Sequence, residues 1–249
     1  MAGEMEERFR ELAEKAWSQG MYRFTHFLDL AALDAYHRVE KNLPPVGRTL
    51  FGGAEGCERQ MIRFGDAENC GYEAEFPIAC LKIAPVSAKY AEELGHRDYL
   101  GALMSLGIER ELLGDIVIRE DCTYLFCEEH IADYIADSLT EVRRTRVRAE
   151  RTENLPEGEL YKTRRVVTQL SSQRLDALIA HVYKMSRSEA QSLFPSGKVF
   201  VNGRMCESPG YTPKEGEIIS VRGSGRMRYA GVDSVSKKGR ENTVVDVYE

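Results

Sequence analysis

The chain has 249 residues, of which 43% are hydrophobic and 30% are charged. This length suits one large domain or two to three small ones, and the composition is that of a globular protein, not of a disordered or fibrous one. The net charge of −6 is unevenly shared, since residues 160–240 carry a net +9 and the first 159 residues a net −12. A basic carboxyl-terminal third favours a polyanion as partner, nucleic acid above all, although a solvated basic face without a ligand is the alternative.

No signal peptide or membrane span is visible, because charge interrupts each apolar stretch within a dozen residues. We therefore expect a cytoplasmic protein without a membrane partner. The cysteines and the five histidines show no metal-ligand spacing, so we expect reduced thiols, no metal and no cofactor. The six cysteines are Cys57, Cys70, Cys80, Cys122, Cys127 and Cys206.

Helical spacing in two segments predicts a helical hairpin at the amino terminus. Apolar residues recur at this spacing in residues 4–18, with Trp17 on the apolar face. A second apolar face runs from Phe27 to about Lys41, and Thr25 is the expected cap of that helix.

A glycine-rich segment follows the hairpin. Pro44 and Pro45 break the second helix, and Gly52-Gly53-Ala54-Glu55-Gly56 comes next. This string lacks the Lys-Ser/Thr of a phosphate loop, so we interpret it as a tight turn. Residues 1–71 are expected to form the first domain.

Residues 72–153 predict a second domain with the order β-α-β-β-α-β, which is the ferredoxin-like, RRM-like arrangement. RNA readers and proteins that bind nothing share this architecture, so the fold alone does not give the function. Phe76, Tyr124 and Phe126 could stack on bases, but core packing is favoured because the Gly-Phe-rich signature of RNA readers is absent. The expected elements are strand 72–86, helix 88–106, strands 115–119 and 123–127, helix 129–139 and strand 142–149.

The last of these strands carries a stripe of arginines. Arg144, Arg146 and Arg148 alternate with small or apolar residues at period two, which places the three guanidinium groups on one face. Their spacing of roughly 7 Å is close to that of successive phosphates. Phosphate contact and an edge strand guarded by charge both remain open.

A linker at residues 154–158 precedes the basic third domain, residues 160–240. An extended segment, 161–169, leads to a helix near Leu175 for which Ser172 is the expected cap. Ser186 and Glu189 predict a capping box at the start of a second, short helix. Asn202-Gly203 between two apolar runs predicts a two-residue hairpin turn.

Four motifs in this domain occur in a fixed order. They are Gln173-Arg174-Leu175-Asp176, Ser186-Arg187-Ser188-Glu189-Ala190, Gly197-Lys198-Val199-Phe200-Val201-Asn202-Gly203 and Gly216-Glu217-Ile218-Ile219. Together they resemble the S-four (S4) RNA-binding domain, a small α/β module. Residues 50–59, 96–108 and 222–226 further resemble the YlmH family of bacterial proteins, so that the resemblance covers nearly the whole chain.

The resemblance implies an RNA-binding, ribosome-associated protein. Members of the YlmH family act in quality control of stalled large subunits, where they bind beside peptidyl-tRNA and support alanine tailing of the blocked chain. The implied partners are ribosomal RNA and transfer RNA on the large ribosomal subunit, together with quality-control factors. The family is also associated with cell-division gene clusters.

The start of the second helix in the third domain is a candidate anion seat, because a helix start offers N–H groups and a positive dipole end. Arg174, Arg187, Lys198 and Arg204 can line one basic surface around it. Arg187 is expected to matter more than Arg240, which stands in a Lys-Lys-Gly-Arg stretch. The expected RNA-binding residues are Arg174, Lys184, Ser186, Arg187, Ser188, Lys198, Asn202, Arg204, Arg226, Arg144, Arg146 and Arg148.

Two motifs suggest enzymes and are better explained without catalysis. Arg174-Leu175-Asp176 also occurs in pseudouridine synthases, but there Thr-Ser-Gly follows, and here Ala177-Leu178-Ile179 does. We expect Asp176 to pair with a basic side chain inside its own domain, and Asn202-Gly203 to act first as turn formers. His96-Arg97-Asp98 copies a kinase triplet, yet Leu103 stands where the kinase asparagine belongs, so a helix entry is favoured.

The sequence therefore predicts an α+β protein that is not an enzyme. Its parts are an amino-terminal helical segment, a central ferredoxin-like domain and a carboxyl-terminal S4 domain, and it acts on the ribosome through RNA. An RNA-modifying enzyme of the pseudouridine-synthase type is one alternative. A ribosome-independent adaptor for RNA or for the cell-division machinery is the other.

Overall fold

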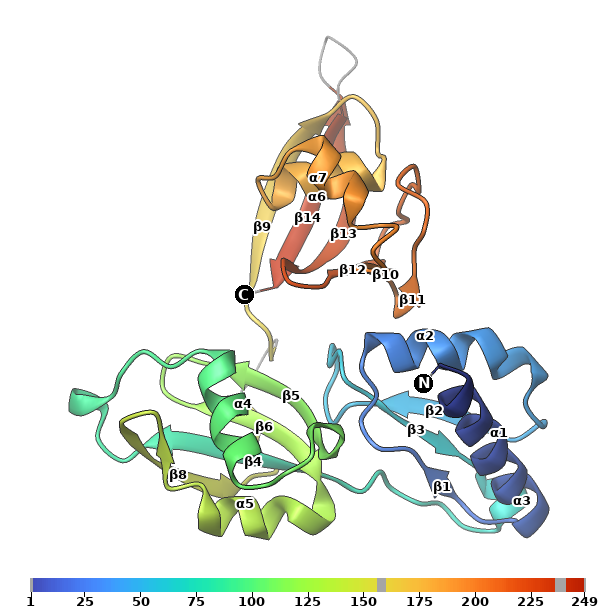
Figure 1. Ribbon diagram of the computed structural model, residues 1–249, viewed down its shortest axis with the longest axis vertical. Helices are drawn as coiled ribbons and strands as arrows, with labels where there is room; N and C mark the ends of the chain where they lie inside the picture. The colour runs from blue at the N-terminus through green and yellow to red at the C-terminus, as the bar shows by residue number, and fades with distance from the viewer. Residues whose placement is uncertain (1, 156–159, 236–240, 249) are drawn as a thin grey trace. The chain divides into compact units, whose positions relative to one another are not determined.

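The computed structural model describes residues 2–155, 160–235 and 241–248 (Figure 1). The chain divides into two compact units, Met1–Leu160 and Tyr161–Glu249. Each unit has its own buried apolar core. Arg240 and most of the linker at 154–158 lie outside the described residues.

The amino-terminal part of the first unit contains the two expected helices and, in addition, a small sheet. The helices pack through Phe9 and Tyr36, whose rings meet edge to face 5.6 Å apart. Trp17, expected on the apolar face, is 47% exposed, whereas Ala13 and Ala16 are fully buried. The sheet has the strand order β1-β3-β2. The elements are α1 (Ala2–Gln19), β1 (Arg23–Phe24), α2 (Leu30–Val39), η1 (Glu40–Asn42), β2 (Arg48–Phe51), β3 (Met61–Phe64) and α3 (Ala67–Cys70).

Thr25 does not cap the second helix. Its backbone is extended beside β3, and its buried Oγ1 accepts a hydrogen bond from the N–H of Ile62 at 2.9 Å. The cap of α2 is Asp29, whose Oδ1 accepts from the N–H of Ala32 at 2.9 Å. The prediction was wrong because tertiary strand pairing uses the threonine that local spacing assigned to a helix.

The central part confirms the ferredoxin-like arrangement. Its antiparallel sheet has the order β5-β6-β4-β8-β7, so the four expected strands lie in the order that the β-α-β-β-α-β fold requires, with the short β7 added. The helix expected from residue 88 begins later, after a separate 3₁₀ turn. The elements are β4 (Ile78–Pro85), η2 (Ala88–Tyr90), α4 (His96–Ser105), η3 (Arg110–Leu112), β5 (Leu113–Ile118), β6 (Thr123–Glu128), η4 (Glu129–Ile131), α5 (Ala132–Ser138), β7 (Glu141–Val142) and β8 (Thr145–Arg151).

The aromatic side chains of the central sheet are packing residues. Leu125 and Cys127 of β6 belong to the core under the helices, so Tyr124 and Phe126, which alternate with them, lie on the opposite face. Both rings are nevertheless buried. A side chain at Gly53 would come within 2.3 Å of the Phe126 ring, which shows how closely the glycine-rich segment covers it. The ring of Phe76 packs against the rings of Phe24 and Phe51, with ring centres 5.7 and 5.4 Å apart.

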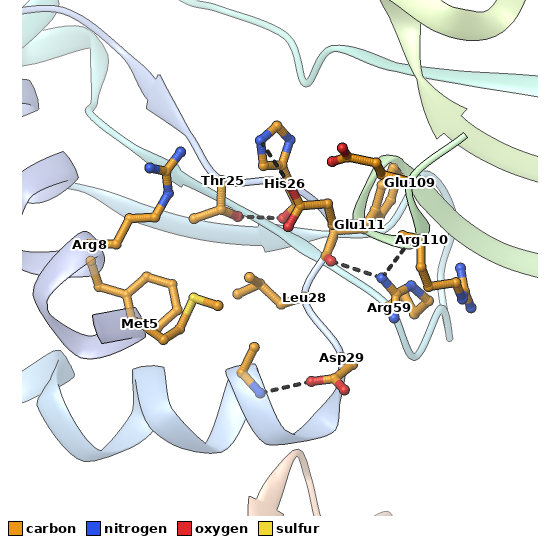
Figure 2. A pocket seen from close by; sticks show the side chains of 13 residues that line it. Met5, Arg8, Thr25, His26, Leu28, Asp29, Arg59, Glu109, Arg110 and Glu111 are labelled. Atoms are coloured by element: carbon orange, nitrogen blue, oxygen red, sulfur yellow. Dashed lines mark hydrogen bonds and ion pairs between the residues drawn. The ribbon is translucent and has the colours of Figure 1, made fainter. Parts of the chain in front are cut away.

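Arg59 joins the amino-terminal and central parts of the first unit (Figure 2). Its guanidinium donates to the carbonyl oxygens of Phe27 at 3.0 Å, Arg110 at 3.1 Å and Leu113 at 2.8 Å. The carboxylate of Asp115 accepts from the backbone N–H groups of Glu58 and Arg59. Burial lowers the pKa of Arg59 to about 10. Residues 2–71 therefore belong to the same compact unit as the central sheet.

The second unit is a six-stranded antiparallel sheet with two helices across one face (Figure 1). The sheet extends beyond residue 240, where the S4 domain was expected to end, because β14 lies between β13 and β9. The strand order is β11-β10-β12-β13-β14-β9. The elements are β9 (Thr163–Leu170), α6 (Leu175–Val182), α7 (Arg187–Ser192), β10 (Val199–Val201), β11 (Arg204–Met205), β12 (Ile218–Val221), β13 (Gly225–Val235) and β14 (Glu241–Tyr248).

Two local predictions in this unit have opposite outcomes, since the hairpin turn is confirmed and the helix cap is wrong. The turn at Asn202 and Gly203 is confirmed, with φ of 49° and 76° as a two-residue hairpin requires. Ser172 does not cap α6, because the helix begins after Arg174 without a side-chain cap. The carbonyl oxygens of Tyr211 and Pro209 accept from the first N–H groups of the helix instead.

Candidate nucleic-acid interface

A buried carboxylate on α6 organises the helix side of the second unit. Asp176 is fully buried, and its two oxygens accept from Nε and Nη2 of Arg174 at 3.1 and 3.2 Å. Arg187 on α7 donates from Nε at 3.3 Å, and Gln191 donates at 2.8 Å. Burial alone would raise the pKa of Asp176, but the hydrogen bonds from Arg174, Gln191 and Arg187 outweigh it and lower the pKa to about 2.

Both arginines keep donors for an external anion. Asp176 uses two nitrogens of Arg174 and only Nε of Arg187, and the two side chains are 42% and 54% exposed. Gly210 lies against Arg174, since a Cβ there would be 3.1 Å from Nη1. Two guanidinium groups are thus held in place by a buried partner, which reduces the side-chain entropy lost when they bind a phosphate. The prediction that Asp176 is an intradomain partner of a basic residue is confirmed.

Side chains of the protein itself bind two N–H groups at the start of α7. The predicted capping box is present: Ser186 Oγ accepts from the N–H of Glu189 at 3.2 Å, and the Glu189 carboxylate accepts from the N–H of Ser186 at 2.7 Å. Ser188 Oγ lies 3.1 Å from Ser186 Oγ. The capping box uses the N–H groups of Ser186 and Glu189, and the anion seat at this helix start stays a prediction.

Three further expected residues are exposed in this unit. Lys184 is exposed in the turn between α6 and α7, with φ of 53°. Arg204 is exposed where β11 leaves the hairpin turn, and Lys198 is exposed just before β10. Asn202 is used by the fold, because its Oδ1 accepts from the N–H of Ile218 at 2.9 Å.

Arg226 belongs to a different face of the sheet. It alternates with Met227 and Tyr229 of β13, which are buried in the core under the helices. Arg226 therefore lies on the face without helices, away from Arg174 and Arg187. The expected RNA-binding residues of the S4 domain do not form one surface.

The arginine stripe of the central sheet is shorter than expected. Arg146 and Arg148 alternate with buried Thr145, Val147 and Ala149 along β8, as predicted. Arg144 is not in the strand, because Val142 pairs with Thr145 and the two residues between them form the turn. Arg148 is also paired with Glu150 at 2.6 Å.

The first unit has a pocket of about 750 Å³ beside the Arg59 junction (Figure 2). Arg8, Arg59 and Arg110 line it together with Asp29, Glu109 and Glu111, so the fixed charges of the wall balance. This composition gives no preference for a polyanion. Asp98, of the kinase-like triplet, accepts from the N–H of Gly95 at 2.8 Å at the start of α4, which confirms the helix entry.

Three general properties of the described residues complete the description of the site. Within residues 2–155, 160–235 and 241–248, no cluster of three or more His, Cys, Asp or Glu side chains could hold a metal ion. In the same ranges, no helix combines the length and apolar character needed to cross a membrane. None of the six cysteines forms a disulfide bond.

Comparisons with known proteins point to one family. The model described as "Putative RNA-binding domain in YlmH" matches residues 72–155, and the S4 domain model matches residues 173–219. Over 202 residues, or 78% of this chain and 76% of the relative, the chain is 31% identical to "Ribosome-associated protein quality control protein P2" of Bacillus subtilis (strain 168). The chain belongs to the YlmH family. The structure of "Cell division protein ylmH from Streptococcus pneumoniae" is also similar, with a TM-score of 0.49, 16% identity, and coverage of 60% of this chain and 89% of that one.

Membership of the YlmH family confirms the resemblance found in the sequence, and with it the S4 domain. The S4 match contains the Asp176 cluster with both of its arginines. It ends before β13 and β14, so Arg226 and the residues around it fall outside the matched region. The two matches account for the RNA-binding character of the chain.

Proposed function

We propose that this protein binds stalled large ribosomal subunits that carry peptidyl-tRNA, and that it acts there in ribosome-associated quality control, including alanine tailing. The observation that carries the proposal is the pair Arg174 and Arg187, held by the buried carboxylate of Asp176 on the helix side of the S4 domain. Lys184, Lys198 and Arg204 are exposed cations of the same unit. The name of the Bacillus subtilis relative supports the ribosome as the place of action.

The arrangement suits folded RNA. Guanidinium groups in fixed positions bind phosphate oxygens through two N–H bonds at once, which fixes orientation without reading sequence. Selectivity then comes from the shape of the RNA, as is usual for structured RNA. The proposed partners are therefore ribosomal RNA and transfer RNA.

The enzyme alternative requires Asp176 as a nucleophile. The carboxylate is fully buried and bound by two arginines, so it cannot reach a base without unfolding of the cluster. We expect that incubation with ribosomal RNA and transfer RNA yields no pseudouridine by mass spectrometry of the digested RNA. Pseudouridine formed by the wild type and lost in Asp176→Asn at unchanged RNA affinity would contradict this expectation.

The test is cosedimentation of the full chain with purified large subunits at several salt concentrations. Arg187→Glu removes a phosphate donor and adds repulsion, so we expect binding about tenfold weaker or more. Lys214→Glu is the matched control, because Lys214 is exposed in the same unit on the turn before β12. It should change the affinity by less than about twofold if a formed site and not bulk charge drives binding.

A second comparison addresses quality control. Subunits that carry peptidyl-tRNA should retain the protein at higher salt than vacant subunits do. Equal retention on both, or equal losses for Arg187→Glu and Lys214→Glu, would favour the ribosome-independent adaptor instead.

A further inference from the structure

The helix-free face of the carboxyl-terminal sheet carries a second group of arginines. Arg226 and Arg228 of β13 lie on it because they alternate with the buried Met227 and Tyr229. Arg165 of β9 is on the same face, since the register places it opposite Asp246, and Asp246 opposite Arg228. These residues are on the other side of the sheet from the Asp176 cluster.

Two tyrosines hold one of these arginines. The guanidinium carbon of Arg226 lies 4.0 Å from the ring centre of Tyr248 and 4.7 Å from that of Tyr161. The two rings are 5.8 Å apart and nearly perpendicular, at 81°. Both tyrosines are partly exposed. A partly exposed aromatic ring beside a cation is a platform on which a base can stack.

A buried carboxylate fixes the other two arginines. Asp246 is only 5% exposed, and it accepts from Arg165 at 3.0 Å and from Arg228 at 3.2 Å. The Arg165 side chain is 68% exposed and that of Arg228 is 40% exposed. One carboxylate therefore orients two exposed cations. Asp246 thus orients two arginines on the helix-free face, as Asp176 does on the helix side.

We propose that this face, defined by Tyr161, Arg165, Arg226, Arg228 and Tyr248, binds single-stranded RNA. Bases stack on the two tyrosines while the arginines contact the phosphates between them. Alternating aromatic rings and cations suit single strands, because their bases are accessible for stacking, whereas in a duplex they are paired inside. The site goes beyond the proposed function, which uses the opposite face, and it lies outside the residues matched by the S4 domain model.

The experiment measures fluorescence anisotropy of the full chain with two labelled probes, a ten-residue oligoadenosine and a blunt RNA duplex. Base stacking on one aromatic ring is worth about 1–3 kcal/mol, so Tyr248→Ala should weaken oligoadenosine binding about fivefold or more. Duplex binding should change less than about twofold. Tyr248→Phe keeps the ring and should behave as the wild type. Tyr134→Ala, at a half-exposed tyrosine of α5, is the matched control and should have no effect.

Arg187→Glu distinguishes this site from the proposed function. It should weaken duplex and subunit binding while oligoadenosine binding is retained. Arg226→Ala should weaken oligoadenosine binding while duplex and subunit binding are retained. Unchanged oligoadenosine affinity in both Tyr248→Ala and Arg226→Ala overturns the inference. So does an equal loss for Tyr248→Ala and Tyr248→Phe.

Crosslinking provides a readout that does not depend on how the variants fold. A 4-thiouridine-containing oligonucleotide bound to the wild type should crosslink to peptides that contain Tyr161, Arg226 or Tyr248. Crosslinks confined to α6 and α7 contradict the site. Displacement of the oligonucleotide by polyglutamate of equal charge, as effectively as by unlabelled RNA, would show attraction by charge alone and would also overturn it.

Discussion

The carboxylate of Asp176 links α6 to α7, because Arg174 at the start of α6 and Arg187 on α7 both donate to it. The sequence predicts a carboxylate paired with a basic side chain, because Arg174 stands two residues before it. It does not predict that Arg187 from the next helix and Gln191 bind the same carboxylate. That contact depends on how α6 and α7 pack, which no local spacing encodes.

Asp176→Asn should destabilise the second unit by about 2 kcal/mol at neutral pH, because the native pKa of about 2 lies well below the ordinary value of 3.8. The ionised carboxylate stabilises the folded state, so its contribution is complete above about pH 4 and is lost as the pH falls towards 2. Urea denaturation of a fragment covering residues 161–249 measures this difference. Asp233→Asn, at an exposed position of β13, is the control and should cost less than about 0.5 kcal/mol.

A stability difference between wild type and Asp176→Asn that stays the same from pH 7 to pH 2.5 would contradict the prediction that the charge of Asp176 stabilises the folded state. The two proteins should approach equal stability near pH 2, where the native wild-type carboxylate is becoming protonated. An unchanged difference would mean that packing around the side chain, and not its charge, stabilises the cluster.

At the scale of elements, signals that need only neighbouring residues were reliable. The Asn202-Gly203 turn and the Ser186–Glu189 capping box are both present, because each is formed by hydrogen bonds and dihedral angles within a few residues. Thr25 and Ser172 failed as caps, since β3 and the carbonyl groups near Tyr211 provide the competing hydrogen bonds. The outcome of a cap prediction thus depends on whether a distant strand or loop uses the same groups.

Two kinds of strand were missed for different reasons. The amino-terminal sheet consists of strands of two to four residues, too short to show a period. The long β13 contains Gly225 and Gly231 and has irregular register with β14, which interrupts the alternation. As a result, the domain boundary predicted from the sequence, residue 240, lies just before β14, which begins at Glu241.

The position of β14 leads to a prediction about boundaries. It pairs with β13 on one side and along all of β9 on the other, and Val245 is fully buried. A fragment of residues 161–249 should therefore fold, whereas residues 161–240 should not, because β9 loses its only described strand neighbour. Dispersion of amide signals in NMR spectra distinguishes the two, and a well-dispersed spectrum for the shorter fragment would refute the prediction.

For the whole molecule, charge is divided unevenly between the units. The basic surplus lies in the second unit, where two carboxylates, Asp176 and Asp246, each hold a pair of arginines. The first unit is acidic overall, and its best candidate contacts with RNA are Arg146 and Arg148 on β8. Phe126 and Tyr124 are buried, so these two rings are not open for the base stacking that other RNA readers of this architecture use.

The last prediction concerns the effect of the acidic unit on RNA binding. If the helix-side surface makes about four phosphate contacts, log K for a structured RNA should fall with log salt concentration with a slope of roughly −3 to −4. At low salt the full chain should bind more weakly than the fragment of residues 161–249, because residues 1–159 carry a net −12 that repels the phosphates. The difference should shrink towards zero at about 0.5 M salt, where charges farther apart than a few ångströms are screened. Filter binding of both proteins over a salt series measures it. If the full chain instead binds more tightly at every salt concentration, and Arg146→Glu removes that gain, then the first unit contacts RNA directly through β8.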